Sequence, residues 1–140
     1  MSSTLAEIVD NFVYLEDWDD RYRYLIELGR ALTPLSETDR TDANRVRGCA
    51  SQVWLRTHIG RDSAGVARLD FFGDSDAHIV RGLVALTLSL FSGRTAADIL
   101  QTDPQPVFDQ LGLSSHLTPQ RANGLRAMVD RIKAEARAVA

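Results

Sequence analysis

The feature that most constrains the fold of this chain is an apolar run near its middle. Between Ile79 and Phe91, large aliphatic residues fall on every side of a helical turn and leave hardly any polar face. A helix of this kind has to be buried, so we expect it at the centre of the protein, packed on a sheet. Its uncharged part runs only from Gly82 to Gly93, well short of the ~20 apolar residues that span a bilayer.

Two runs of alternating residues predict that sheet. From Val53 to Ile59, and again from Val66 to Phe72, apolar residues recur at every second position with mostly polar residues between them, which is the period of half-buried strands. Turn residues at 60–65 separate the two runs, so together they predict a hairpin. A short strand at 45–47 would extend the hairpin to three strands.

Helical spacing and capping residues predict further helices on both sides of the hairpin. They are expected after the capping box Thr4–Glu7, from Trp18 to Leu32, after a second capping box at Thr95–Asp98, around Phe108, and from Pro119 to the C-terminus. The segment Gly73–Asp76 is predicted to be a turn that caps the apolar helix. The fold class that follows is α+β, a small antiparallel sheet packed against several helices.

Composition narrows the class of protein. With 140 residues, of which 44% are hydrophobic and 25% charged, the chain is expected to form one soluble globular domain over residues 1–140. The net charge of -3 argues against a nucleic-acid partner. Glu7 and Asp10 come early, and no apolar targeting segment follows Met1. We therefore expect a cytoplasmic protein with no membrane partner.

The only cysteine, Cys49, follows Gly48 at an expected bend just before the first strand. Arg45 and Arg47 place positive charge nearby, and cations favour the thiolate, which is the reactive form of cysteine. A free cysteine is also commonly a small buried hydrophobe, and the residues alone favour that interpretation. One cysteine can form neither an internal disulfide nor the four-ligand site that an iron–sulfur cluster usually takes.

Three segments together resemble the SufE family, whose members accept sulfur from cysteine desulfurases in iron–sulfur cluster assembly. Residues 45–55 resemble the family's cysteine motif, and residues 73–83 and 116–121, the latter followed by Gly124 and Leu125, resemble two further blocks in the same order. The resemblance covers nearly the whole chain. It implies a three-stranded sheet in a two-layer, SufE/IscU-like architecture, and it implies that Cys49 forms a persulfide.

The resemblance also implies partners. A SufS-like, pyridoxal-phosphate-dependent cysteine desulfurase would supply sulfur and be stimulated, and a SufBCD-like cluster scaffold would receive the sulfur. The protein would then be a sulfurtransferase-type accessory protein rather than a stand-alone enzyme, holding no cofactor and no metal of its own. Its oligomeric state stays open between a monomer and a weak homodimer.

Two other functions stay open. The protein could be a docking activator that stimulates a desulfurase without carrying sulfur, or a stand-alone hydrolase that pairs Cys49 with His58 or His116. The three histidines, the third being His78, show no paired metal-ligand spacing. A zinc site would therefore arise only if the fold happened to bring them together.

Four residues are candidates for supporting roles in the site: Gly48, Ser51, Asp74 and Arg121. Arg121 matches a family arginine and could steer an anionic persulfide, although a solvated helix arginine fits its spacing equally well. For Asp74 we favour a structural role, as the N-cap of the apolar helix.

Arg45 and Arg47 are candidates for docking the partner, because they flank Cys49. Trp54 is expected in the core. Ala50 and His78 depart from the residues commoner in the family, which leaves loop packing and partner preference open.

Overall fold

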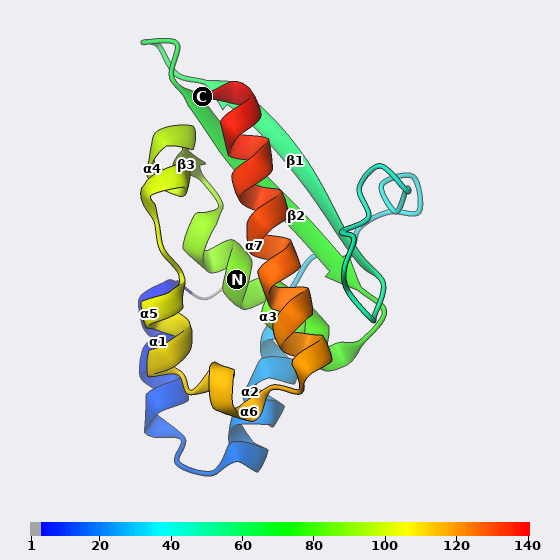
Figure 1. Cartoon of the computed structure of the whole chain (residues 1–140), viewed down its shortest axis with the longest axis vertical. Coiled ribbons are helices and arrows are strands. Elements are labelled where there is room, and N and C mark those ends of the chain that lie inside the picture. Colours follow the sequence, from blue (N-terminus) through cyan, green and yellow to red (C-terminus); the bar gives the residue numbers. More distant parts are fainter. Residues whose placement is uncertain (1–3) are drawn as a thin grey trace.

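The computed structural model describes residues 4–140, so the prediction about the segment after Met1 falls partly outside it. Within that range the helices are α1 (Leu5–Tyr14), α2 (Trp18–Arg30), α3 (His78–Phe91), α4 (Ala96–Gln101), α5 (Gln105–Gln110), α6 (Leu113–His116) and α7 (Pro119–Val139). The strands are β1 (Val53–Arg61), β2 (Ala67–Ser75) and β3 (Arg94–Thr95). The α+β fold class is therefore confirmed. In Figure 1 the long helix α7 runs beside the sheet and in front of α3, and α1 and α2 lie at the end opposite the hairpin tip.

Helix α3 lies at the centre of the protein, as its apolar sequence predicts. It packs against α2, β2 and α7, and Leu86 and Phe91 are completely buried. The approach of α2 depends on two glycines. A side chain at Gly82 would overlap the carbonyl of Leu25, and one at Gly29 would begin 2.8 Å from the Cβ atom of Arg81.

The sheet has the predicted three antiparallel strands, but its third strand is a different segment. β2 pairs along its length with β1 on one side and with the short β3 on the other. Gly93, with φ of +79°, turns the chain back after α3, and this turn allows Arg94 to pair with Leu69.

The predicted strand at 45–47 forms only an isolated bridge, between Arg45 and Trp54. Pairing with β1 stops there because the chain turns at Gly48, where φ is +90°. The amide of Val46 still donates to the carbonyl of Val53 over 2.8 Å. This bond closes the base of the loop that carries Cys49.

Two further predictions need correction. β2 continues through Ser75, so residues 73–75 are strand and not a capping turn, and the N-cap of α3 is Ala77, without a side-chain hydrogen bond. Helix α6 was not predicted. It follows Gly112, whose φ of +71° ends one turn and allows the next to begin.

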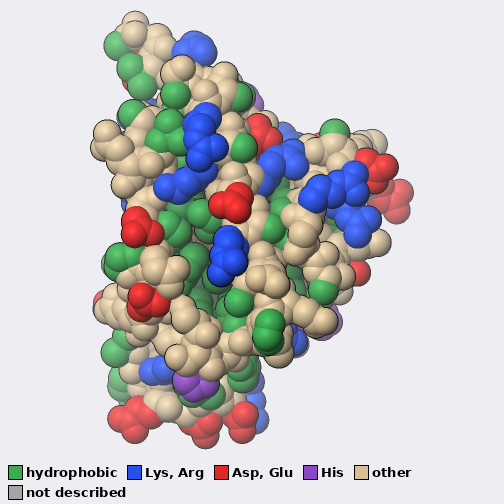
Figure 2. All heavy atoms as spheres, viewed as in Figure 1, with side chains coloured by type: hydrophobic (Ala, Val, Ile, Leu, Met, Phe, Trp, Pro, Cys, Tyr) green, Lys and Arg blue, Asp and Glu red, His purple; other side chains and the backbone are tan. Residues whose placement is uncertain are grey.

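The predicted caps of the outer helices are confirmed. Thr4 accepts from the amide of Glu7, Thr95 from that of Asp98, and Thr118 from that of Arg121. Acidic side chains gather at the end of the molecule where α1 meets α2, and basic side chains lie along the face that carries α7 (Figure 2). Among residues 4–140, no helix has the length and apolar character that a membrane crossing requires.

Candidate functional site

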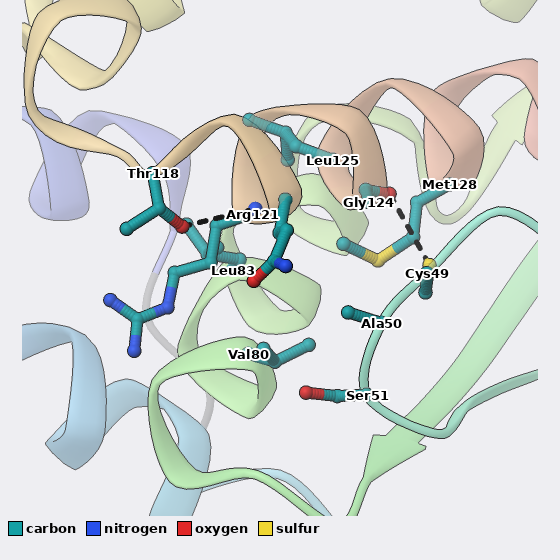
Figure 3. Close-up of a pocket in the computed structure, with 11 residues that line it drawn as sticks. Cys49, Ala50, Ser51, Val80, Leu83, Thr118, Arg121, Gly124, Leu125 and Met128 are labelled. Atoms are coloured by element: carbon teal, nitrogen blue, oxygen red, sulfur yellow. Dashed lines mark hydrogen bonds between the residues drawn. The ribbon is translucent and has the colours of Figure 1, made fainter.

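Cys49 lies at the tip of the loop between Val46 and β1, and it packs against α7. Its sulfur is 3.6 Å from the carbonyl oxygen of Gly124 and can donate a weak hydrogen bond to it (Figure 3). A Cβ atom at residue 124 would lie 3.5 Å from the sulfur, in ordinary van der Waals contact, so the space beside Cys49 has room for a methyl group but not for a larger side chain. Gly48 gives the loop its turn, and a side chain on it would begin 3.4 Å from Ala127.

A cavity of about 220 Å³ opens beside Cys49, between the loop, α3 and the first turns of α7. Its apolar wall consists of four side chains: Val80, Leu83, Leu125 and Met128. Its polar lining comes from Ser51 of the loop and from Thr118, Gln120 and Arg121 at the start of α7. Such a wall excludes water from one side of the sulfur while the loop side stays accessible.

Burial raises the pKa of the Cys49 thiol above its ordinary value, and the positive charge of Arg45 opposes that rise. Cys49 is half-buried, and at neutral pH it is therefore a protonated thiol in this conformation. A protonated thiol is a poor nucleophile. The site accordingly holds its sulfur in a protected and weakly reactive state.

Most of the predicted site residues lie around this loop. Gly48, Ser51 and Arg121 contribute to the loop or the cavity, as stated above, whereas Arg45 precedes the loop and Arg47 is its first residue. Arg121 lines the cavity, but its guanidinium points away from Cys49 (Figure 3). Steering of a persulfide by Arg121 would therefore require its side chain to turn.

Asp74 is not among the residues that line the cavity, and it does not cap α3. Its buried carboxylate instead pairs with Arg40 at 2.7 Å and with Arg81 at 3.0 Å, and it accepts from the amide of Leu35 at 3.0 Å. Burial alone would raise its pKa, but these hydrogen bonds, one from the amide of Ser75, and the charge of Arg81 hold the pKa of Asp74 below its usual range. Asp74 thus fastens the segment after α2 to β2 and α3.

The histidines, all of them in the described part of the chain, do not line the cavity of Cys49. The ring of His116 stacks on Trp18 with centroids 3.8 Å apart, and His58 and His78 are exposed. No cluster of three or more potential metal ligands occurs within residues 4–140. The arrangement gives Cys49 no general base of the kind that a hydrolase needs.

Sequence reasoning missed the residues of α7 that hold the cysteine loop. Gly124 and Met128 contact or face Cys49, and Arg131 donates to the carbonyls of Ala43 and Arg45. One signal was present: a glycine inside a helical pattern is unfavourable and usually has a packing reason. Nothing in the local sequence identified its partner, which lies 75 residues away.

Comparisons with known proteins agree with this fold and identify a family. The family described as "SufE: Fe-S metabolism associated domain" matches residues 6–136. An uncharacterized SufE-like protein of Rhizobium meliloti is 53% identical over 134 residues, covering 96% of this chain and 95% of the relative. A similar one from Rhizobium etli is 53% identical over 135 residues, covering 96% and 90%.

Among solved structures, the fold resembles the solution structure of a hypothetical protein from Thermus thermophilus. The TM-score is 0.73 at 20% sequence identity, with 96% of this chain and 94% of the other covered. At this identity the likeness concerns the fold alone. The family match and the two relatives, which extend over almost the whole chain, show that the protein belongs to the SufE family, a family associated with Fe-S metabolism.

Proposed function

We propose that the protein is a sulfur acceptor that takes a sulfur atom from a cysteine desulfurase onto Cys49. The observation that carries the proposal is the position of this residue. In a chain of the SufE family, the only cysteine lies at a loop tip beside an apolar-walled cavity of about 220 Å³. That cavity has room for a second sulfur, and its wall protects a persulfide from water and stray thiols.

The transfer is a thiol–persulfide exchange. The thiolate of Cys49 attacks the outer sulfur of the donor's persulfide, a new S–S bond forms on Cys49, and the S–S bond of the donor breaks to release its cysteine as a thiolate. The hydrogen of the persulfide travels with the outer sulfur, so atoms and electrons balance without an external oxidant. Cys49 then passes the outer sulfur on, to a cluster scaffold in this proposal.

The raised pKa of Cys49 requires an activating step before the attack. In this conformation the thiol is protonated and lies against Gly124, so docking of the desulfurase has to move the loop outward into a more polar environment. Arg45 and Arg47 are suited to meet acidic groups of the partner, because they lie within four residues of Cys49 and have no ion-pair partner in the described range.

The test measures sulfide release from L-cysteine by a SufS-like desulfurase, with and without this protein, followed by intact-mass analysis. We expect faster release and one added sulfur on Cys49. The Cys49→Ser variant should bind the desulfurase but gain no sulfur and give no stimulation. If wild-type protein leaves release unchanged with every SufS-like desulfurase tried, and gains no mass, the proposal is wrong.

A second candidate is a docking activator that carries no sulfur. The observation that favours it is the protonated, half-buried resting state of Cys49, which is unsuited to attack. The same experiment separates the two functions, because a docking activator would keep its stimulation in the Cys49→Ser variant. A stand-alone hydrolase is not proposed, since no histidine of the described chain lines the cavity.

A further inference from the structure

The loop that carries Cys49 is held by several hydrogen bonds at its base and by almost none at its tip, where Cys49 packs against α7. On the N-terminal side, the amide of Val46 bonds to Val53 at 2.8 Å, and the amide of Leu55 bonds to the carbonyl of Asn44 at 2.7 Å. Among the described residues, the only hydrogen bond made by residues 47–51 is the weak one from Cys49 to Gly124. Residues 47–51 can therefore move while both ends of the loop stay in place.

Arg131 of α7 secures the N-terminal side of this base from outside the sheet. Its guanidinium donates to the carbonyl of Ala43 at 2.7 Å and to that of Arg45 at 3.3 Å, and its Nε atom donates to Glu135 at 2.9 Å. The planar guanidinium fork of Arg131 thus donates three hydrogen bonds in fixed directions, an arrangement that the ammonium group of a lysine cannot reproduce. Glu135, one helical turn further along, fixes the orientation of the fork.

The C-terminal side of the base is secured at Gln52. Its amide donates to the carboxylate of Asp76 at 3.1 Å, and its carbonyl accepts from the hydroxyl of Ser75 at 2.7 Å and from the amide of Asp76 at 3.3 Å. The two fastenings come from different elements, since Arg131 belongs to α7 and Ser75 to the end of β2. Neither Arg131 nor Asp76 is among the residues that line the cavity.

We propose that Arg131 and Asp76 are positioning residues: they hold both ends of the loop in place, so that only residues 47–51 move when Cys49 moves. This deepens the proposed function, because it states how far the sulfur can travel. Cys49 lies three residues from Val46 and three from Gln52, so the extended chain allows it to reach roughly 10 Å from either anchor. A donor persulfide has to come within that distance, so the partner must dock around the mouth of the cavity.

The first experiment needs no desulfurase, so its result is independent of the proposed function. The rate at which iodoacetamide alkylates Cys49 is measured in the free protein, together with the free energy of unfolding. Without the hydrogen bonds from the Arg131 guanidinium to the loop base, Cys49 should leave its contact with Gly124 more often and become accessible to the reagent. We expect Arg131→Gln to raise the alkylation rate about fivefold, or about 1 kcal/mol at 1.36 kcal/mol per factor of ten.

Three further variants keep the test decisive if Arg131→Gln folds poorly. Arg131→Lys retains the charge but not the fork, so it should restore the wild-type rate only in part, and Asp76→Ala should accelerate alkylation on its own. Arg126→Gln is the matched control: Arg126 is an exposed arginine of the same helix that neither lines the Cys49 cavity nor forms an ion pair in the described chain. If Arg131→Gln and Asp76→Ala are folded and alkylate at the wild-type rate, the inference is wrong.

The second experiment uses the desulfurase. If Arg131 determines how far Cys49 can reach, Arg131→Gln should raise the concentration of this protein that gives half-maximal stimulation of the desulfurase. That increase should exceed the loss in the maximal rate of sulfide release. Equal loss of both parameters in a folded variant would contradict the positioning role. A wild-type protein that gives no stimulation would overturn the proposed function instead, and the alkylation result would still decide the role of Arg131.

Discussion

The sulfur of Cys49 lies 3.6 Å from the carbonyl oxygen of Gly124, at a position on α7 where a Cβ atom would stand 3.5 Å from that sulfur. Gly124 therefore provides the surface on which the loop rests. A distance of 3.5 Å is ordinary van der Waals contact, so one methyl group fits there without moving the loop. Any larger side chain would compete with Cys49 for the same space.

This relationship predicts opposite results for two substitutions at Gly124. Gly124→Ala should raise the free energy of unfolding by up to about 1 kcal/mol, because alanine is favoured over glycine inside a helix. It should leave the alkylation rate of Cys49 unchanged. Gly124→Leu should displace the loop and raise that rate several-fold. Urea unfolding and alkylation kinetics check both, and a slow, wild-type rate in a folded Gly124→Leu variant would contradict the contact.

The reactivity of Cys49 should follow its raised pKa. Because burial favours the protonated thiol, the alkylation rate of the free protein should reach half of its maximum at a pH above ~8.5, the midpoint of an unperturbed cysteine. Arg45→Gln should move the profile to still higher pH, since it removes the charge that opposes the rise. Arg23→Gln, a change at an exposed arginine of α2, should leave it in place. A profile that levels off below pH 8 would show that Cys49 is not held as described.

The sequence predicted those parts of the fold that local patterns determine. The caps at Thr4, Thr95 and Thr118, the hairpin and the buried helix α3 all follow from neighbours within a few residues. The third strand was misplaced because Arg45 has the right residue type and position for pairing, whereas Gly48 turns the chain away. Strand propensity alone cannot decide whether residues 45–47 continue to pair with β1 or enter a turn.

For the candidate site, the sequence singled out Cys49 but not the residues that surround it in the fold. Cys49 stood out as a single cysteine in a recognisable motif, but its contact with Gly124 and the clamp of Arg131 join segments 75 and 86 or more residues apart. Asp74 is a further case in which contacts between residues far apart in the sequence decide the role of a side chain. Its residue type fits an N-cap, and only the fold reveals that Arg40 and Arg81 take its carboxylate instead.

The crossing of α2 and α3 gives a test of the core. Gly82→Ala should lower the free energy of unfolding by roughly 2–3 kcal/mol, because the added carbon overlaps the carbonyl of Leu25 and the helices must separate. Gly60→Ala is the control, since residue 60 faces open space. Chemical denaturation of both variants measures the difference. Similar stabilities would mean that the two helices do not approach as closely as described.

The ion pairs of Asp74 should make the protein sensitive to acid. The folded state keeps the pKa of Asp74 below that of the unfolded chain, so its contribution is fully present above the unfolded pKa and is lost as the pH falls through the lower, folded value. Asp74→Asn should lower the free energy of unfolding at pH 7 by about 2 kcal/mol, because two arginines lose their anionic partner.

The pH dependence separates this effect from a loss of packing. Below the ordinary aspartate pKa of about 3.9 the wild-type protein progressively loses the same interaction, so the difference between wild type and Asp74→Asn should shrink. Asp70→Asn on the same strand, where no ion pair is formed within the described chain, should stay within about 0.5 kcal/mol of wild type at pH 7. Urea unfolding at pH 7 and pH 3 provides the measurement. A difference that stays constant with pH would show that the Asp74 carboxylate is not paired as the structure places it, since only an ionised partner loses its contribution on protonation.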